Sequence, residues 1–210
     1  MVVRKLTLGS AFQANCYIMD NEEKEAVAID IGGDSQEFLK FINEHNLTLK
    51  KILLTHGHYD HFKGVADVVK STGTEVFIHT ADKNMLTSAD ESLASFIGNN
   101  EKFNEVDKCT TFSDGEIIDF SGTPINVVYT PGHTKGCVCF ICEDKLFSGD
   151  TLFRMSIGRT DLPGGDYSTI KHSLAVLKDI GKYNDYEVYP GHDSMTTLSY
   201  EIKNNQYMKD

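Results

Sequence analysis

Thr55-His56-Gly57-His58-Tyr59-Asp60-His61 places three histidines and one aspartate in seven residues, directly after the apolar run Ile52-Leu53-Leu54. In a loop that leaves a strand, His56 and His58 can point at one ion, while the aspartate and the third histidine continue around the turn. Imidazole and carboxylate together suit zinc, iron or manganese, and the absence of a thiolate argues against a structural zinc site. The stretch predicts an enzyme that binds one or two transition-metal ions at the end of a β-strand. The plainer alternative is a polar loop of solvated histidines.

Length, charge and cysteine content narrow the class of protein. A chain of 210 residues suffices for one domain, and we expect a single domain over 1–210. The formal net charge of −11 disfavours binding to nucleic acid or to an anionic membrane surface. The N-terminus lacks the apolar stretch of a signal peptide, and the longest apolar run, Cys137 to Cys142, is too short to span a bilayer. Five cysteines without framework spacing favour reduced thiols and a cytoplasmic location.

Apolar runs alternate with turn signals along the chain, which predicts a mixed α and β fold. The expected strands are Val2–Leu8, Cys16–Met19, Ala26–Ile31, Ile52–Thr55, Glu75–His79, Ile117–Phe120, Ile125–Tyr129, Cys137–Cys142, Lys145–Ser148 and Glu187–Tyr189. The expected helices are Gln36–Asn46, Phe62–Ser71, Ala81–Leu86, Tyr167–Ile180 and Met195–Met208. Ser35 and Asp166 are the predicted caps of the first and fourth of these helices.

Three further apolar runs end as the first one does, in a small or turn residue followed by a side chain that can bind a metal. These side chains are His133 after Pro131-Gly132, Asp150 after Ser148-Gly149, and His192 after Pro190-Gly191. Strand ends hold functional groups on rigid supports and leave them open to substrate. The repetition extends the prediction from one motif to a set of seven residues.

Taken together, these residues resemble the metallo-β-lactamase superfamily. The blocks that carry the resemblance are Thr55–His61, Thr130–Thr134, Ser148–Phe153 and Tyr189–His192. Within the superfamily the nearest likeness is to the glyoxalase II-like hydrolases, because of Gly149–Phe153 and Ser156–Gly165. The resemblance implies an α/β (α+β) fold, a four-layer αββα sandwich with the active site along one edge.

The resemblance also implies a set of ligands for two divalent metal ions, zinc first, with iron or manganese compatible. The first ion would be held by His56, His58 and His133, the second by Asp60, His61 and His192, and Asp150 would bridge the two. Asp60 and Asp150 are therefore the expected catalytic carboxylates. Zinc β-lactamases often place a thiolate at the ligand position that Asp150 occupies, so β-lactam hydrolysis is disfavoured.

The implied reaction is attack of a metal-bridging hydroxide on a carbonyl carbon. A thioester such as an S-acylglutathione suits this site, because its thiol, with a pKa of about 8.5, can leave without a proton donor. Glyoxalase II proper carries a C-terminal helical region that helps to grip glutathione, whereas 18 residues follow His192 here. We therefore expect a small-molecule thioester as substrate and leave its identity open.

Two alternatives remain at this point. Persulfide dioxygenases of the same superfamily resemble the chain across the same blocks and would hold a single iron with His56, His133 and Asp150. A non-catalytic metal-binding module is the other.

In the loop after Asp150, Arg159 could grip a substrate carboxylate or form a local ion pair with Asp161. Core or surface roles are expected for a last group of residues: His45, His79, His172, Cys137, Cys139 and Cys142.

Overall fold

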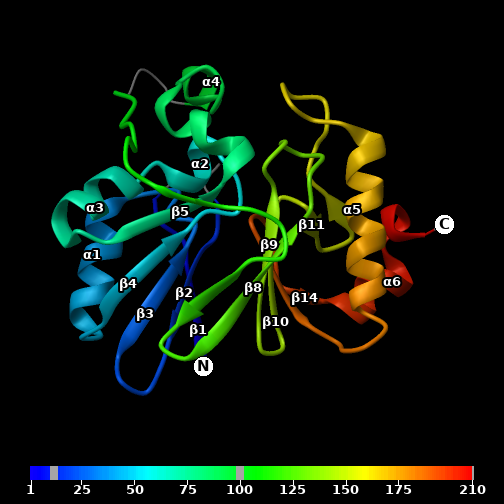
Figure 1. Ribbon diagram of the computed structural model, residues 1–210, viewed down its shortest axis with the longest axis horizontal. Helices are drawn as coiled ribbons and strands as arrows, with labels where there is room; N and C mark the ends of the chain where they lie inside the picture. Colours follow the sequence, from blue (N-terminus) through cyan, green and yellow to red (C-terminus); the bar gives the residue numbers. More distant parts are fainter. Residues whose placement is uncertain (10–13, 98–101, 210) are drawn as a thin grey trace. The chain divides into compact units, whose positions relative to one another are not determined.

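The chain folds as two compact units, Met1–Phe112 and Ser113–Asp210. The computed structural model describes residues 1–9, 14–97 and 102–209. Each unit consists of a β-sheet with helices packed on one face (Figure 1). The mixed α and β architecture predicted from the alternation of apolar runs is confirmed.

The first unit is a six-stranded sheet in the order β1-β2-β3-β4-β5-β6. Its first three strands are antiparallel and its last four are joined by parallel pairings. The strands are β1 (Val2–Leu6), β2 (Cys16–Asp20), β3 (Glu25–Ile29), β4 (Thr48–Leu53), β5 (Glu75–His79) and β6 (Thr110–Phe112). The helices are α1 (Ser35–Glu44), α2 (Tyr59–Phe62), α3 (Val65–Thr72), α4 (Ala94–Ile97) and the 3₁₀ helix η1 (Thr80–Thr87).

The core of the first unit lies between its central strands and the helices α1 and α3. Phe38 of α1 and Val68 of α3 pack in one cluster with Ala28 of β3 and Ile52 of β4. The spacing of the apolar residues of α1 gives the helix one buried stripe, and its opposite face is charged. This packing fixes the carboxyl ends of β3 and β4, from which the first group of candidate ligands departs.

The second unit is a six-stranded sheet in the order β14-β13-β10-β9-β8-β7, with a separate two-stranded hairpin, β11-β12. Only β10 and β13 pair in parallel among its described strands. The strands are β7 (Ile117–Phe120), β8 (Thr123–Tyr129), β9 (Val138–Cys142), β10 (Lys145–Gly149), β11 (Leu152–Phe153), β12 (Ser156–Ile157), β13 (Glu187–Pro190) and β14 (Thr196–Thr197). The helices are α5 (Tyr167–Ile180), α6 (Leu198–Asn204) and the 3₁₀ helix η2 (Gln206–Met208).

The core of the second unit joins α5 and α6 to one face of its sheet. Leu174 and Leu177 of α5 share a cluster with Leu146 of β10 and Val188 of β13. As predicted, Cys139 is buried here, on the same face of β9 as Ile141. The adjacent, parallel strands β10 and β13 bring two more chain segments with candidate ligands to one edge.

Several element boundaries differ from the sequence prediction. The helix expected over Phe62–Ser71 is interrupted, because the Gly64 N–H donates to the Ile31 carbonyl at 2.9 Å between α2 and α3. The segment expected as an α-helix over Ala81–Leu86 is the 3₁₀ helix η1. The helix expected over Met195–Met208 begins only at Leu198, because the preceding threonines pair with β13 as β14. The prediction had no strand at β6, β11, β12 or β14, which are too short to show alternation.

One predicted helix cap is confirmed and one is wrong. The Asp166 carboxylate accepts the Thr169 N–H of α5 at 2.6 Å, as expected. In α1 the cap is Asp34 and not Ser35, because the Asp34 carboxylate accepts the N–H groups of Gln36 and Glu37 at 2.8 and 3.1 Å. Two backbone donors on one carboxylate oxygen make Asp34 the better cap.

Across the part of the chain that the structure describes, every helix is too short or too polar to cross a lipid bilayer.

Candidate metal centre

The first unit gathers four of the predicted ligands on the segment between β4 and α2. We call His56, His58, Asp60 and His61 the first-unit cluster. The pairing of β4 with β5 continues past the strand end, since the Leu54 N–H donates to the Phe77 carbonyl at 2.9 Å. Two of the histidines therefore leave a rigid support, and the other two ligands follow within the first turn of α2.

Asp30, directly after β3, fixes the orientation of two of these histidines. Its Oδ2 accepts the hydroxyl of Thr55 at 2.7 Å and faces Nδ1 of His61 at 2.9 Å, so Nδ1 of His61 carries the proton. Because the only Thr55 hydroxyl proton goes to Asp30, Thr55 Oγ1 accepts from Nδ1 of His56, 3.1 Å away. In both histidines the lone pair is thereby left on Nε2, the form that a metal ligand needs.

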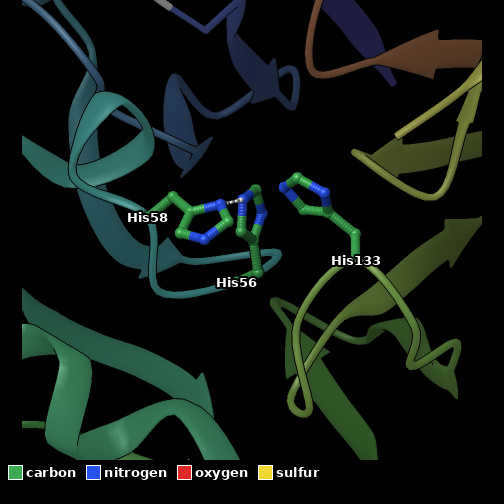
Figure 2. A group of neighbouring side chains, drawn as sticks. All are labelled: His56, His58 and His133. Carbon is green, nitrogen blue, oxygen red and sulfur yellow. Dashed lines mark hydrogen bonds between the residues drawn. The ribbon is translucent and has the colours of Figure 1, made fainter. Parts of the chain in front are cut away.

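His56 and His58 face each other through their ring nitrogens. Nε2 of His56 and Nδ1 of His58 are 3.1 Å apart, with the rings at 84° to each other (Figure 2). Two nitrogens bound tetrahedrally to one zinc lie about 3.3 Å apart, given a Zn–N distance of about 2.05 Å. The pair therefore fits a shared ion. Because Nε2 of His56 holds a lone pair, the contact is a hydrogen bond donated by Nδ1 of His58.

A second buried carboxylate supports this pair from η1. Asp82 Oδ2 accepts the N–H of Gly57, the residue between the two histidines, at 3.0 Å. This bond holds the backbone from which both rings project. Of the core and surface roles considered for His79, the structure shows a buried one, in which its Nδ1 accepts the Ala81 N–H at the start of η1.

Asp60 and His61 complete the first-unit cluster. One Asp60 oxygen and one ring nitrogen of His61 lie within 4.8 Å of each other, and the same holds for nitrogens of His56 and His61. The backbone of Asp60 packs closely on Gly32, where an added Cβ would lie 1.7 Å from the Asp60 carbonyl oxygen. A side chain at position 32 would therefore displace the turn that carries Asp60.

The second unit brings together the other three predicted ligands, which follow three different strands. We call His133, Asp150 and His192 the second-unit cluster. One oxygen of Asp150, Oδ2, lies 3.4 Å from Nε2 of His133 and 3.6 Å from Nε2 of His192. These separations are close to the about 3.3 Å expected between two donors on one tetrahedral ion. Asp150 Oδ2 thus lies near the imidazoles of both His133 and His192, as expected of a carboxylate that two metal ions can share.

The loop after Asp150 fixes the orientation of His133. Nδ1 of His133 donates to the carbonyl of Arg159 at 2.7 Å, which leaves the lone pair on Nε2 (Figure 2 shows His133 on its loop). Gly158 makes this loop possible, because a Cβ there would lie 1.9 Å from the Asp150 carbonyl oxygen. Gly158 thus packs against the backbone of Asp150, and the next residue, Arg159, binds the ring of His133.

The other polar residues near this loop have local partners. Arg159 forms a bidentate ion pair with Asp161, with both contacts at 2.7 Å, and this hydrogen-bonded guanidinium lowers the pKa of Asp161 to about 2. Of the two roles considered for Arg159, the local ion pair is therefore the one that the structure shows. The ring of Phe153 lies edge-on to that of His192, with centroids 5.9 Å apart.

A single family model, described as the metallo-beta-lactamase superfamily, matches residues 9–192 and so covers all seven candidate ligands. The chain belongs to the metallo-β-lactamase superfamily. The fold class predicted from the sequence is confirmed by structures of this fold. The superfamily includes metal-dependent hydrolases, and its members generally bind two metal ions.

Individual superfamily members are similar along the whole chain. A hydroxyacylglutathione hydrolase, GloC of Haemophilus influenzae, is 36% identical over 203 residues, which are 95% of this chain and 94% of GloC. The crystal structure of BLEG-1, a B3 metallo-β-lactamase, superposes with a TM-score of 0.92 at 31% identity and covers 100% of both chains. TTHA1623 in a di-iron-bound form superposes with a TM-score of 0.85 at 32% identity over 97% of this chain and 99% of its own.

The residues that orient the ligands were not predicted from the sequence. Asp30 lay inside the expected strand Ala26–Ile31, where a carboxylate that interrupts an apolar run before Gly32-Gly33 is the signal that could have identified it. Asp82 lay inside the expected helix Ala81–Leu86 and gives no comparable signal. The Arg159 carbonyl is a backbone group, which no residue pattern identifies.

Proposed function

We propose that this protein is a metal-dependent hydrolase of thioesters such as S-acylglutathiones. The observation that carries the proposal is the position of Asp150 Oδ2 between Nε2 of His133 and Nε2 of His192. A carboxylate there, where the zinc β-lactamases often have a thiolate, favours the glyoxalase II-like branch. The 36% identity to a hydroxyacylglutathione hydrolase over nearly the whole chain supports the same branch.

The proposed ligand assignment joins the two clusters in one binuclear centre within a single domain over 1–210. His56, His58 and His133 would hold the first ion, and Asp60, His61 and His192 would hold the second. Asp150 would contact both ions, and Asp60 and Asp150 are the proposed catalytic carboxylates. The donor set is borderline in hardness and suits zinc, with iron or manganese as alternatives.

When bound, the ions supply a hydroxide at neutral pH and a Lewis acid for the carbonyl oxygen. The residues of the chain supply orientation. Asp30 holds His56 (through Thr55) and His61 in the tautomer with the lone pair on Nε2, and the Arg159 carbonyl does the same for His133. The proton on Nδ1 of His58 has to leave before His56 and His58 can both act as donors.

The proposed substrate class follows from the leaving group. A thiol with a pKa of about 8.5 leaves as thiolate, so the site needs no general acid. Arg159 is engaged by Asp161 and would have to exchange this partner to bind a substrate carboxylate. The net charge of −11 supports a small-molecule substrate over a nucleic acid or a membrane surface. The five cysteines without framework spacing support a cytoplasmic location.

An iron-dependent persulfide dioxygenase is the second candidate. Two histidines and one carboxylate, here His56, His133 and Asp150, are the donor set that such iron sites use. The similarity to TTHA1623, which was crystallised in a di-iron-bound form, favours a test of iron as well as zinc.

The deciding experiment measures metal content and three activities on the same protein. Protein purified without added metal is analysed for zinc, iron and manganese, then assayed with S-lactoylglutathione, with a chromogenic β-lactam, and for oxygen uptake with glutathione persulfide. We expect thioester cleavage that Asp150→Asn abolishes. The matched control is Asp179→Asn, which changes an exposed aspartate paired with Lys182. Oxygen uptake without thioester cleavage would replace the hydrolase with the dioxygenase, and β-lactam cleavage alone would refute the thioester assignment.

A further inference from the structure

Two fully buried polar residues of the last helical segment, Glu201 and Asn205, bind the turn of the β11-β12 hairpin. Both are 0% exposed. Glu201 Oε2 accepts the N–H of Met155 at 2.8 Å. Nδ2 of Asn205 donates to the carbonyls of Ser156 at 3.0 Å and Phe153 at 3.5 Å. The polar backbone groups of the hairpin turn are thus bound by side chains from the chain's last fifteen residues.

These two side chains also support each other. Asn205 Nδ2 donates to Glu201 Oε2 at 2.9 Å, and the Thr196 hydroxyl donates to Glu201 Oε1 at 2.7 Å. A buried carboxylate is stable only when such donors compensate for the lost water. Both carboxylate oxygens of Glu201 are engaged in this way, so the network is closed and its geometry is fixed.

The hairpin depends on this support. It contains two residue pairs, Leu152 with Ile157 and Phe153 with Ser156, and an isolated two-stranded hairpin of this size is marginal in water. Its turn also holds Met155 at a φ of 62°, a left-handed conformation that a side chain disfavours. Its two strands are also held by the core contacts of Leu152 and Ile157, so the bonds from Glu201 and Asn205 act chiefly on the turn between them.

Both ends of the hairpin lead directly to the second-unit cluster. Its first strand begins two residues after Asp150. Its second strand runs into Gly158, which packs on the Asp150 carbonyl, and then into Arg159, whose carbonyl accepts the proton of His133 Nδ1. A shift of the hairpin would therefore move a ligand and the hydrogen-bond acceptor of a second ligand together.

We propose that Glu201 and Asn205 are positioning residues that hold the 150–159 loop, and through it Asp150 and His133, in the geometry for metal binding. The hydrogen bonds of both residues to this loop go to the backbone of the hairpin, so the effect passes through that backbone. This inference rests on the proposed metal centre, and its test uses metal affinity as well as activity.

The test compares Asn205→Ala with Asn204→Ala. Asn204 is the last residue of α6 and precedes Asn205, and its side chain donates to the Tyr200 carbonyl within α6. Zinc affinity is measured by competition with a chromophoric chelator. We expect affinity about tenfold weaker in Asn205→Ala, the lower end of the loss seen when a ligand's supporting partner is removed, and within about twofold of wild type in Asn204→Ala. We also expect kcat for S-lactoylglutathione to fall with little change in KM.

Glu201→Met provides a second variant if Asn205→Ala does not fold. It roughly keeps the size of the side chain but removes both acceptor oxygens, so the Met155 N–H and the Thr196 hydroxyl both lose their acceptor. We expect the same loss of zinc affinity and faster hydrogen exchange at the Met155 amide. Folded variants that bind zinc as tightly as wild type would overturn the inference and leave the proposed function intact. A wild-type protein that binds no metal would overturn the proposed function itself.

Discussion

The two ligand clusters are built in different ways. The first-unit cluster comes from one loop and one helical turn, with all four residues between positions 56 and 61. The second-unit cluster takes its residues from three strand ends between positions 133 and 192. Both clusters have a buried acceptor that fixes an imidazole, a carboxylate from Asp30 in the first and the backbone carbonyl of Arg159 in the second.

This difference determines which cluster depends on the rest of the fold. The first-unit cluster needs the ends of β3 and β4 to be correctly placed, and these strands are direct neighbours. The second-unit cluster needs the pairing of β10 with β13, the turn after β8 and the 150–159 loop to be correct at once. We therefore expect the second-unit cluster to be more sensitive to changes far away in the sequence.

The largest effect is expected from Asp150→Ala, which removes the residue that we assign to both ions. We expect kcat/KM for S-lactoylglutathione to fall by about 10³-fold or more, the loss of about 4 kcal/mol of transition-state stabilisation. Steady-state kinetics and metal analysis on the same sample measure this, with Asp179→Ala as the control. Activity within tenfold of wild type would show that the second-unit cluster is not part of the catalytic centre.

A smaller effect is expected from Asp30→Asn, which tests the support of the first-unit cluster. The amide keeps the shape of Asp30 but cannot accept from the Thr55 N–H, the Thr55 hydroxyl and His61 Nδ1 together. Metal affinity should fall by about 10–100-fold, the range for partners that orient metal-bound histidines. Chelator competition measures the loss.

Asp67→Asn is the matched control, because Asp67 is an aspartate of the same unit that accepts from Ser35. Equal affinity in wild type and Asp30→Asn would mean that the tautomers of His56 and His61 do not depend on Asp30.

The smallest expected effect is the slow chemical labelling of Cys139, a buried thiol of the second unit. Burial raises the pKa of Cys139 to about 11, and its Sγ contacts Thr130 Oγ1 and the Ser148 carbonyl, close to His133 and Asp150 in the chain. At pH 8 about one thiol in 10³ would then be ionised. Labelling with a disulfide reagent at this pH should modify the half-buried Cys109 first and Cys139 only on unfolding. Rapid labelling of Cys139 in the native protein would show that the strand ends of this unit open readily.

The sequence predicted the ligand candidates better than it predicted their surroundings. His56–His61 is recognisable because its residues are neighbours in the chain, and His133, Asp150 and His192 because each follows an apolar run and a glycine. Asp82 and Glu201 could not be identified in this way, because their roles depend on contacts across 25 and 46 positions. The short strands β11 and β14 were missed for a different reason, because two residues are too few to show the alternation of a strand.

The central claim, that the two clusters together hold two ions, is tested most directly by zinc titration of metal-depleted protein. Wild type, the first-unit variant His58→Ala and the second-unit variant His192→Ala are titrated in parallel with a calorimetric readout. We predict about two equivalents for wild type and about one for each variant, since each loses a ligand of one ion. Saturation of wild type at one equivalent, or two tight equivalents in either variant, would contradict the claim.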